Sequence, residues 1–197
     1  SMISAWYSTP RPGNIGVVME TLLDPVDQGN AFWDLQFRRN KVKTPIEFVI
    51  STLRALGSPA NSDNLVAWAS DMGMEMFERD EPDGFPEIGN DWIGTTTLLQ
   101  RINFARRFAA NADNDFPWTL ADIIGDAPLG AQEVLDIFDE VLFQSSMTEA
   151  ERCLALDYLE SGLDGSFLPL DPAAGDYANR VRDMVGYLFS LPRFQFQ

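Results

Sequence analysis

The sequence predicts an all-α protein: a single helical domain of about seven or eight helices with one long ordered loop. Three observations support this prediction. Apolar residues recur at helical spacing through most of the 197 residues. Helix-capping residues stand in front of these segments, and no segment shows the alternating pattern that would compete as a strand. A hydrophobic content of 45% is enough for a core.

The N-terminal stretch is the least regular part of the chain. It contains two prolines and a glycine, so we expect an arm that Trp6 and Tyr7 hold down. The expected boundaries are 1–14 for the arm and 15–197 for the helical domain, either as one body or as two packed halves, 15–115 and 116–197. Short helices are predicted first over 15–23, after the N-cap Asn14, and then over 26–37.

The central helix runs from Thr44 to Gly57 and has a complete set of boundary signals. Thr44 is an N-cap, Pro45 occupies the first helical position, and Glu47 follows where a capping box requires it. Thr44, Glu47 and Gly57 are therefore assigned structural roles. Apolar residues lie on two sides of this helix, which predicts that Arg54 is half-buried and needs a partner.

A long connection follows the next helix, which is predicted over 62–77. Residues 78–93 contain two prolines and six acidic residues, and a connection of this length is either disordered or held by its own side chains. Its apolar residues favour an ordered loop around a hollow, and this is the predicted binding site. The candidate binding residues are Arg54, Arg101, Asp83, Phe85 and Trp92. The alternative is that Phe85 and Trp92 only pin the loop to the core.

The helix predicted over 95–110 carries an arginine within its apolar side. Arg101 would be costly there without a carboxylate, so we expect a salt bridge. Glu47 is the expected partner of either Arg54 or Arg101. The alternative, an acid/base pair of Glu47 with Asp83 or Asp91, has no sequence pattern that would position the two groups.

The C-terminal half reads as further helices. Thr148 and Glu151 form a second capping box, and Pro192 ends the last helix. The predicted helices are 119–124, 131–144, 149–161 and a final one that begins near Asp171 or Asp176.

The charge balance excludes several classes of protein. Thirty acidic residues against 14 basic ones give a net charge of −16. Nucleic acids and anionic membranes need a basic face, so we predict no nucleic-acid partner. The longest apolar runs are far too short for a transmembrane helix, so we also predict no membrane insertion. The acidity, with only two lysines, is typical of either an acidic soluble protein or a salt-adapted one. The run RRNKVK at 38–43 is either an anion-binding spot or local neutralisation.

Residue types also limit the chemistry. The chain has no histidine, which removes the usual catalytic triads and most zinc sites. Cys153 lies in a helical pattern and is expected in the core. The spacing Asn111, Asp113, Asp115 resembles the start of a calcium loop, but Phe116 stands where that loop needs glycine. We therefore predict no catalytic residue, no metal and no cofactor.

Three segments carry a resemblance to a known family. They are KVKTPIEFVISTLRALG, MGMEMFERDEPDGFPEIGNDWIGTTTLLQRINFARRFA and the terminal LFSLPRFQFQ, and the resemblance around them extends over 38–110 and 185–197. They resemble the C-terminal part of the bacterial family known as domain of unknown function 1800. Met74 departs from the family's usual glutamine. The family's N-terminal half, rich in histidine, asparagine and glutamate, has no counterpart in this chain.

The resemblance implies no activity, and it places any catalytic centre mostly outside this chain. The leading hypothesis is a non-catalytic helical interaction or scaffold module, the C-terminal part of a larger bacterial protein, with a protein or a small molecule as its partner. The alternative is an accessory half of an enzyme whose catalytic groups lie in a missing N-terminal region. The resemblance leaves an exported protein as one option for the compartment.

Overall fold

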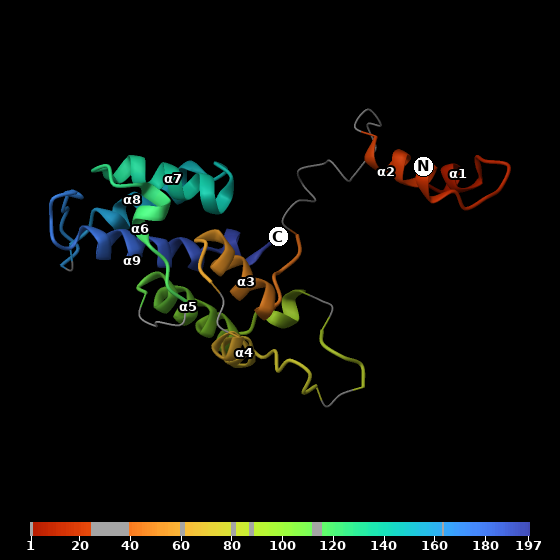
Figure 1. Cartoon of the computed structure of the whole chain (residues 1–197), viewed down its shortest axis with the longest axis horizontal. Helices are drawn as coiled ribbons and strands as arrows, with labels where there is room; N and C mark the ends of the chain where they lie inside the picture. Colours follow the sequence, from red (N-terminus) through yellow and green to blue (C-terminus); the bar gives the residue numbers. More distant parts are fainter. Residues whose placement is uncertain are drawn as a thin grey trace. The chain divides into compact units, whose positions relative to one another are not determined.

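The computed structural model contains helices joined by loops (Figure 1). It describes residues 2–24, 40–59, 62–79, 82–86, 89–111, 116–162 and 164–197. Within these ranges there are nine α-helices, and no strand forms beyond two isolated bridges, Val42 with Phe196 and Ser161 with Phe167. The predicted all-α fold is confirmed.

Contacts divide the chain into two units, Ser1–Asn40 with Gln197 and Lys41–Phe196. The first unit contains α1 (Met2–Tyr7) and α2 (Ile15–Leu23), which pack against each other. The expected arm, 1–14, thus contains the short helix α1. Helix α2, which was expected in the helical domain, belongs to the same unit as this arm. The predicted N-cap is present, because Asn14 Oδ1 accepts a hydrogen bond from the Gly16 amide at 3.1 Å. The helix expected over 26–37 lies outside the described residues.

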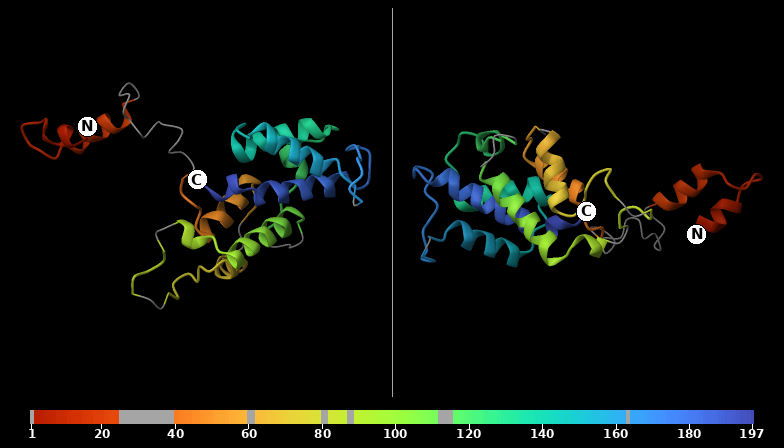
Figure 2. Two further views of the ribbon diagram at one scale, coloured as in Figure 1. Left: turned by 180° about the vertical axis from the view of Figure 1, so that it is seen from behind. Right: turned by 90° about the horizontal axis from the view of Figure 1, so that it is seen from below.

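The second unit holds the remaining helices. Their bounds are α3 Pro45–Ala55, α4 Ser62–Asp71, α5 Thr95–Ala109, α6 Leu120–Ile124, α7 Ala131–Phe143, α8 Glu149–Leu159 and α9 Tyr177–Ser190, with 3-10 turns η2 Gly89–Trp92 and η3 Pro192–Gln195. Helices α5 and α9 lie side by side at its centre (Figure 2). Gly186 permits this approach, since a Cβ there would lie 3.2 Å from Arg106 Cα.

Aromatic side chains dominate the core of this unit. Phe194, just after α9, packs edge-on against Phe189 with ring centroids 4.8 Å apart and against Phe48 of α3 at 5.8 Å. Phe104 of α5 contacts the other side of Phe48 at 6.1 Å. Such pairs add to the stabilisation from buried area alone. The two ends of the unit's sequence are therefore joined through one aromatic cluster.

The predicted helix caps are present. Thr44 Oγ1 accepts from the Glu47 amide, and Glu47 Oε2 accepts from the Thr44 amide at 2.8 Å. The same reciprocal pair links Thr148 and Glu151 before α8. Each cap satisfies backbone donors that a helix start leaves free, so the two helices begin where the sequence indicates.

Helix α4 is shorter than expected. The prediction extended it over 62–77, whereas the structure ends it at Asp71. Gly73 adopts φ +91, and the Met74 amide donates to the Ala69 carbonyl, as in a glycine C-cap. Phe77 is then 97% exposed with φ +67. The glycine stop signal overrides the apolar spacing that continues beyond it.

Candidate functional site

Arg101 is fully buried, and no carboxylate pairs with it among the described residues. Its Nη2 donates to the main-chain carbonyl of Lys43 at 2.8 Å, and Nη1 donates to Gln195 Oε1 at 3.3 Å. Its guanidinium also lies 5.2 Å from the centroid of the Phe48 ring. The expectation of a salt bridge was wrong, because neutral oxygens and a ring face solvate this cation.

Burial lowers the pKa of Arg101 from its usual range to about 10, so the guanidinium stays charged at neutral pH. Gln195, the second acceptor, is itself buried and donates from Nε2 to the Phe189 carbonyl at 3.1 Å. The Lys43 amide donates to the Gln195 carbonyl at 2.8 Å. These bonds tie together the segment before α3, helix α5 and the C-terminal turn, which is a structural role.

The 78–93 connection is described in part, over 78–79, 82–86 and 89–93. Trp92 is buried, and its Nε1 donates to the Pro86 carbonyl at 3.0 Å. The half-buried Phe85 ring lies 5.8 Å from that of Trp92. Within the part of the loop that is described, these two aromatics hold the backbone.

The surroundings of the other candidate residues differ from those that the sequence predicted. Arg54 is exposed on α3 and not half-buried as expected, and Asp83 is exposed as well. Glu47 pairs with Lys41, Oε1 to Nζ 2.5 Å, and within the described ranges it forms no ion pair with Arg54 or Arg101. Neither of the two cavities described below is lined by Arg54, Arg101 or Trp92. Binding at these residues stays a prediction.

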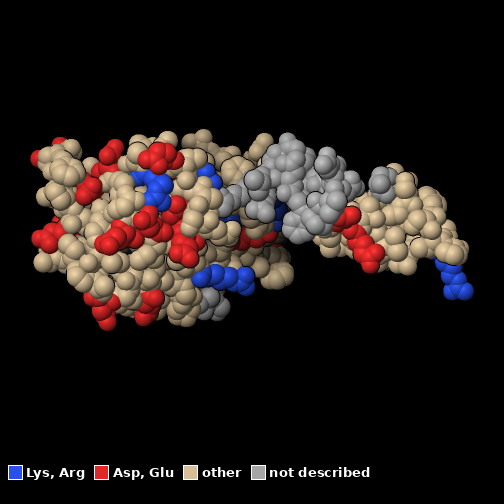
Figure 3. Space-filling model, turned by 90° about the horizontal axis from the view of Figure 1, so that it is seen from above, with Lys and Arg blue, Asp and Glu red and all other residues tan. Residues whose placement is uncertain are grey.

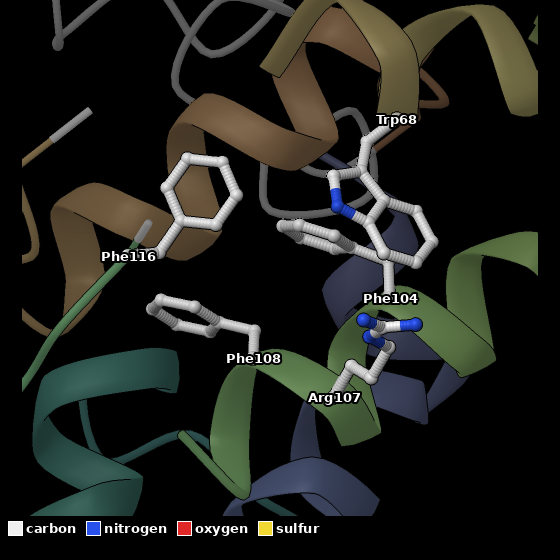
Figure 4. Close-up of a pocket in the computed structure, with 5 residues that line it drawn as sticks. All are labelled: Trp68, Phe104, Arg107, Phe108 and Phe116. Carbon is white, nitrogen blue, oxygen red and sulfur yellow. The ribbon is translucent and has the colours of Figure 1, made fainter. Parts of the chain in front are cut away.

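A first cavity lies between α4 and α5, beside Phe116 (Figure 4). The rings of Trp68, Phe104, Phe108 and Phe116 line it, and Arg107 lies at its edge with its guanidinium 5.7 Å from the Trp68 ring. Its volume is about 10 Å³. A single water needs about 10–15 Å³, so this cavity is a packing gap and not a ligand site.

A second cavity is a surface groove of about 310 Å³. Helix α6 and the turn after it form one wall, and the segment that opens α9 forms the other. Its lining residues are Leu120, Ala121, Ile124, Gly125, Asp126, Ala127, Pro128, Pro172 and Tyr177. Apolar side chains make up most of this lining, and a groove of this kind is the default place for a ligand or a partner side chain.

Core contacts hold both walls of the groove. Trp118, two residues before α6, is buried and donates from Nε1 to the Phe108 carbonyl at 3.0 Å. On the other wall, Tyr177 Oη donates to the Leu129 carbonyl at 3.2 Å. Burial, with the negative charge of Glu133, raises the pKa of Tyr177, so its hydroxyl remains a donor at neutral pH.

Acidic residues lie in the groove lining and next to it in sequence. Asp126 belongs to the lining and is exposed. Three further exposed aspartates adjoin lining residues in sequence: Asp122 on α6, Asp171 before Pro172, and Asp176 before Tyr177. No sequence pattern predicted this groove, although the turn GDAPLG and the Asp-Pro pair at 171–172 lie at its two edges.

Two further expectations concern possible reactive groups. Cys153 is exposed on α8, with Sγ 3.8 Å from Glu149 Oε1, and not in the core. Cys153 lies on the side of α8 that faces solvent. Cysteine is small and occurs both in cores and on surfaces, so the residue type alone does not show which side it occupies. In the calcium-like stretch, 112–115 lie outside the described residues. Among the residues that are described, no group of three acidic or cysteine side chains is placed to hold a metal ion.

Comparison with known proteins gives one match. The model of a family described as "Protein of unknown function (DUF1800)" matches residues 1–196. This match is wider than the two stretches, 38–110 and 185–197, that carried the resemblance. No curated protein and no solved structure matches the chain. In the described ranges, no helix has both the length and the hydropathy to cross a bilayer.

Proposed function

The chain belongs to the DUF1800 family, whose function is unknown, and from this premise we propose that it is a non-catalytic helical interaction module that holds a partner protein in the groove between α6 and α9. The observation that carries the proposal is the groove itself. Its apolar lining is open to solvent, and exposed apolar hollows on a folded surface mark interaction sites.

The construction of the groove favours recognition of a projecting side chain. Leu120 is 8% exposed and gives the groove an apolar floor. Gly125, at φ +74, turns the chain so that Ala127 and Pro128 form an edge. Because the walls are fixed through Trp118 and Tyr177, the groove can accept a partner without first ordering a loop, which lowers the entropic cost of binding.

The buried ionisable groups fit a scaffold. Perturbed pKa values often mark catalytic sites when they occur in a cleft. In this chain the pKa of Arg101 is strongly lowered, and this residue lies in the core, where it holds three chain segments together. Lys43 and Asp139, also buried, contact respectively the Phe194 ring and the Met147 amide. These contacts are those of a framework that keeps the groove in shape.

Site-specific photo-crosslinking tests the proposal. Benzoylphenylalanine is placed at Ala121 or Ala127 in the groove, and at Asp157 on the exposed face of α8 as the matched control. After irradiation in an extract of its own cells, we expect the same second protein to be attached from both groove positions and not from the control. Equal adducts at all three positions, or none from the groove, would contradict a partner held there.

A further inference from the structure

We propose that the partner's contact segment is a cationic peptide in which one or two apolar side chains are flanked by lysine or arginine. This inference rests on the proposed function and names the chemistry of the partner. It follows from two properties of the groove, its apolar floor and the sign of the charges around it.

The volume of the groove limits what enters it. About 310 Å³ is at the lower end of ligand pockets, which run from roughly 300 to 1,000 Å³. Leu120 and Ile124 in the lining offer no side-chain hydrogen bond, so this part of the groove favours an apolar group. The open flanks let the chain that carries this group continue across the rim on both sides.

The rim decides which residues can flank the apolar group. Asp126 lines the groove, and Asp122, Asp171 and Asp176 stand next to it in sequence, all exposed. The residues that line the groove fall in two parts of the chain, 108–151 and 153–179. Neither of these parts contains a lysine, an arginine or a histidine. Acidic side chains are also abundant on the visible face of this unit (Figure 3). An acidic flank would therefore be repelled and a basic flank attracted.

In the described part of the chain, Arg180 and Arg182 of α9 form no ion pair with these aspartates. Arg180 donates to the carbonyls of Leu159 and Pro169, at 2.8 and 3.1 Å, and to that of Leu168. The guanidinium of Arg182 lies 5.8 Å from the Trp118 ring. Both cations hold the backbone or an aromatic ring of this unit. Asp171 is partly engaged, since its Oδ1 accepts from the Ala173 amide at 2.9 Å, but it retains acceptor capacity.

Exposed charges contribute more to selectivity and association rate than to affinity. The acidic residues beside the groove should therefore determine which peptide is preferred more than how tightly any peptide binds. We expect a basic-flanked peptide to bind about tenfold more tightly than its neutral counterpart at low salt, with the difference shrinking as screening increases.

Three fluorescent hexapeptides with the same Leu-Phe centre test this, flanked by lysines, glutamines or glutamates. Binding to the whole chain is measured by anisotropy at about 50 and about 500 mM sodium chloride. We expect the order lysine, glutamine, glutamate, with the gap compressed at high salt. Asp126→Asn with Asp176→Asn should reduce the lysine advantage to about twofold. Asp157→Asn with Asp183→Asn removes the same charge from exposed positions outside the lining and should leave the advantage intact.

Ala127→Trp fills the groove and should abolish binding of both the lysine and the glutamine peptides. Ala121→Trp provides a second block should the first variant fail to show the helical circular dichroism of the parent. If the lysine and glutamine peptides bind equally well and the tryptophan variants block both, the charge preference is overturned. The groove would then remain an interaction site without that preference. Lysine-peptide binding that survives both tryptophans would overturn the inference, since the contact would be diffuse. Failure of every peptide would count against the groove itself.

Discussion

Nη2 of Arg101 donates to the main-chain carbonyl of Lys43 at 2.8 Å, across 58 residues of sequence. Nη1 reaches Gln195, 94 residues away. The three motif stretches that resemble the family thus meet at one buried guanidinium. This convergence gives a physical reason for the arginine, since its planar guanidinium holds several donors in a rigid fork and can serve acceptors in different directions.

Replacement of Arg101 should be among the most damaging single changes. Arg101→Ala leaves the Lys43 carbonyl and the Gln195 amide without their donor and opens a cavity, so we expect a loss of about 3–5 kcal/mol in the free energy of unfolding. Arg101→Lys should fall between this variant and the parent, because one ammonium cannot satisfy both acceptors in the guanidinium geometry. Denaturant titration followed by circular dichroism gives the values.

The matched control for this experiment is Arg54→Ala. Arg54 is exposed on α3, so its removal should change stability by no more than about 0.5 kcal/mol. A similar loss for Arg54→Ala and Arg101→Ala would show that removal of positive charge from an acidic protein, and not the buried bonds, accounts for the effect.

Glu47 should act through its cap more than through its charge. Its Oε2 accepts from the Thr44 amide, while in the described part of the chain its carboxylate also pairs with Lys41, whose side chain is 58% exposed. Exposed ion pairs contribute little. We therefore expect Glu47→Gln to cost about 0.5 kcal/mol or less and Glu47→Ala about 1–2 kcal/mol. Equal losses for the two variants would mean that the charge, and not the hydrogen bond, matters.

Acid should weaken the junction between α8 and the C-terminus. Burial of the Glu151 carboxyl works against its ionisation, but hydrogen bonds from Arg193 and Thr148 prevail and lower its pKa below the ordinary 4.5. A group with a lowered folded pKa stabilises the fold above its unfolded pKa, and this contribution is lost as the pH falls through the folded value. Glu151→Gln should therefore reduce stability at pH 7 and flatten the decline below about pH 5.

Melting curves from pH 7 to pH 2.5 check this expectation. Glu140→Gln is the control, because Glu140 is exposed on α7 and pairs with no arginine in the described part of the chain. It should keep the parent's dependence on pH. An unchanged slope in Glu151→Gln would indicate that other carboxyl groups account for the acid transition.

The fold class and most helix boundaries followed from local signals. The capping boxes at Thr44 and Thr148 were predictable because a cap needs only a few neighbouring residues in the right order. The partners of Arg101 were not, because they lie 58 and 94 residues away and one of them is a main-chain carbonyl. Every residue type has such a carbonyl, so no sequence pattern reveals it.

The groove escaped prediction for a related reason. Its walls come from segments that are about 50 residues apart, around Ala121 and Pro172, and each wall taken alone reads as an ordinary helix start or turn. Periodicity shows which face of a helix is apolar, but a hollow depends on how two elements are spaced. The exposed Cys153 and Arg54 illustrate the same limit, since exposure is set by neighbours from other elements.

Sodium chloride should stabilise the folded chain. The net charge is −16, and folding brings these charges together, so the native state is strained by repulsion. At about 1 M salt the screening length falls to roughly 3 Å, which removes most of this repulsion. The same salt weakens the ion pairs of Glu47, Asp136 and Glu151, but the acidic excess outweighs them. We expect the melting temperature to rise by several degrees, and potassium chloride to act alike.

A charge-reduced variant separates screening from other effects of salt. Asp122→Asn, Asp126→Asn, Asp157→Asn and Asp183→Asn together remove four exposed negative charges. If repulsion is the cause, this variant should melt at a higher temperature than the parent at low salt and gain less on addition of salt. A parent melting temperature that stays flat or falls as salt rises would contradict the prediction. An equal gain in the parent and in the variant would assign the effect to ion exclusion from the surface, because that term does not depend on the removed charges.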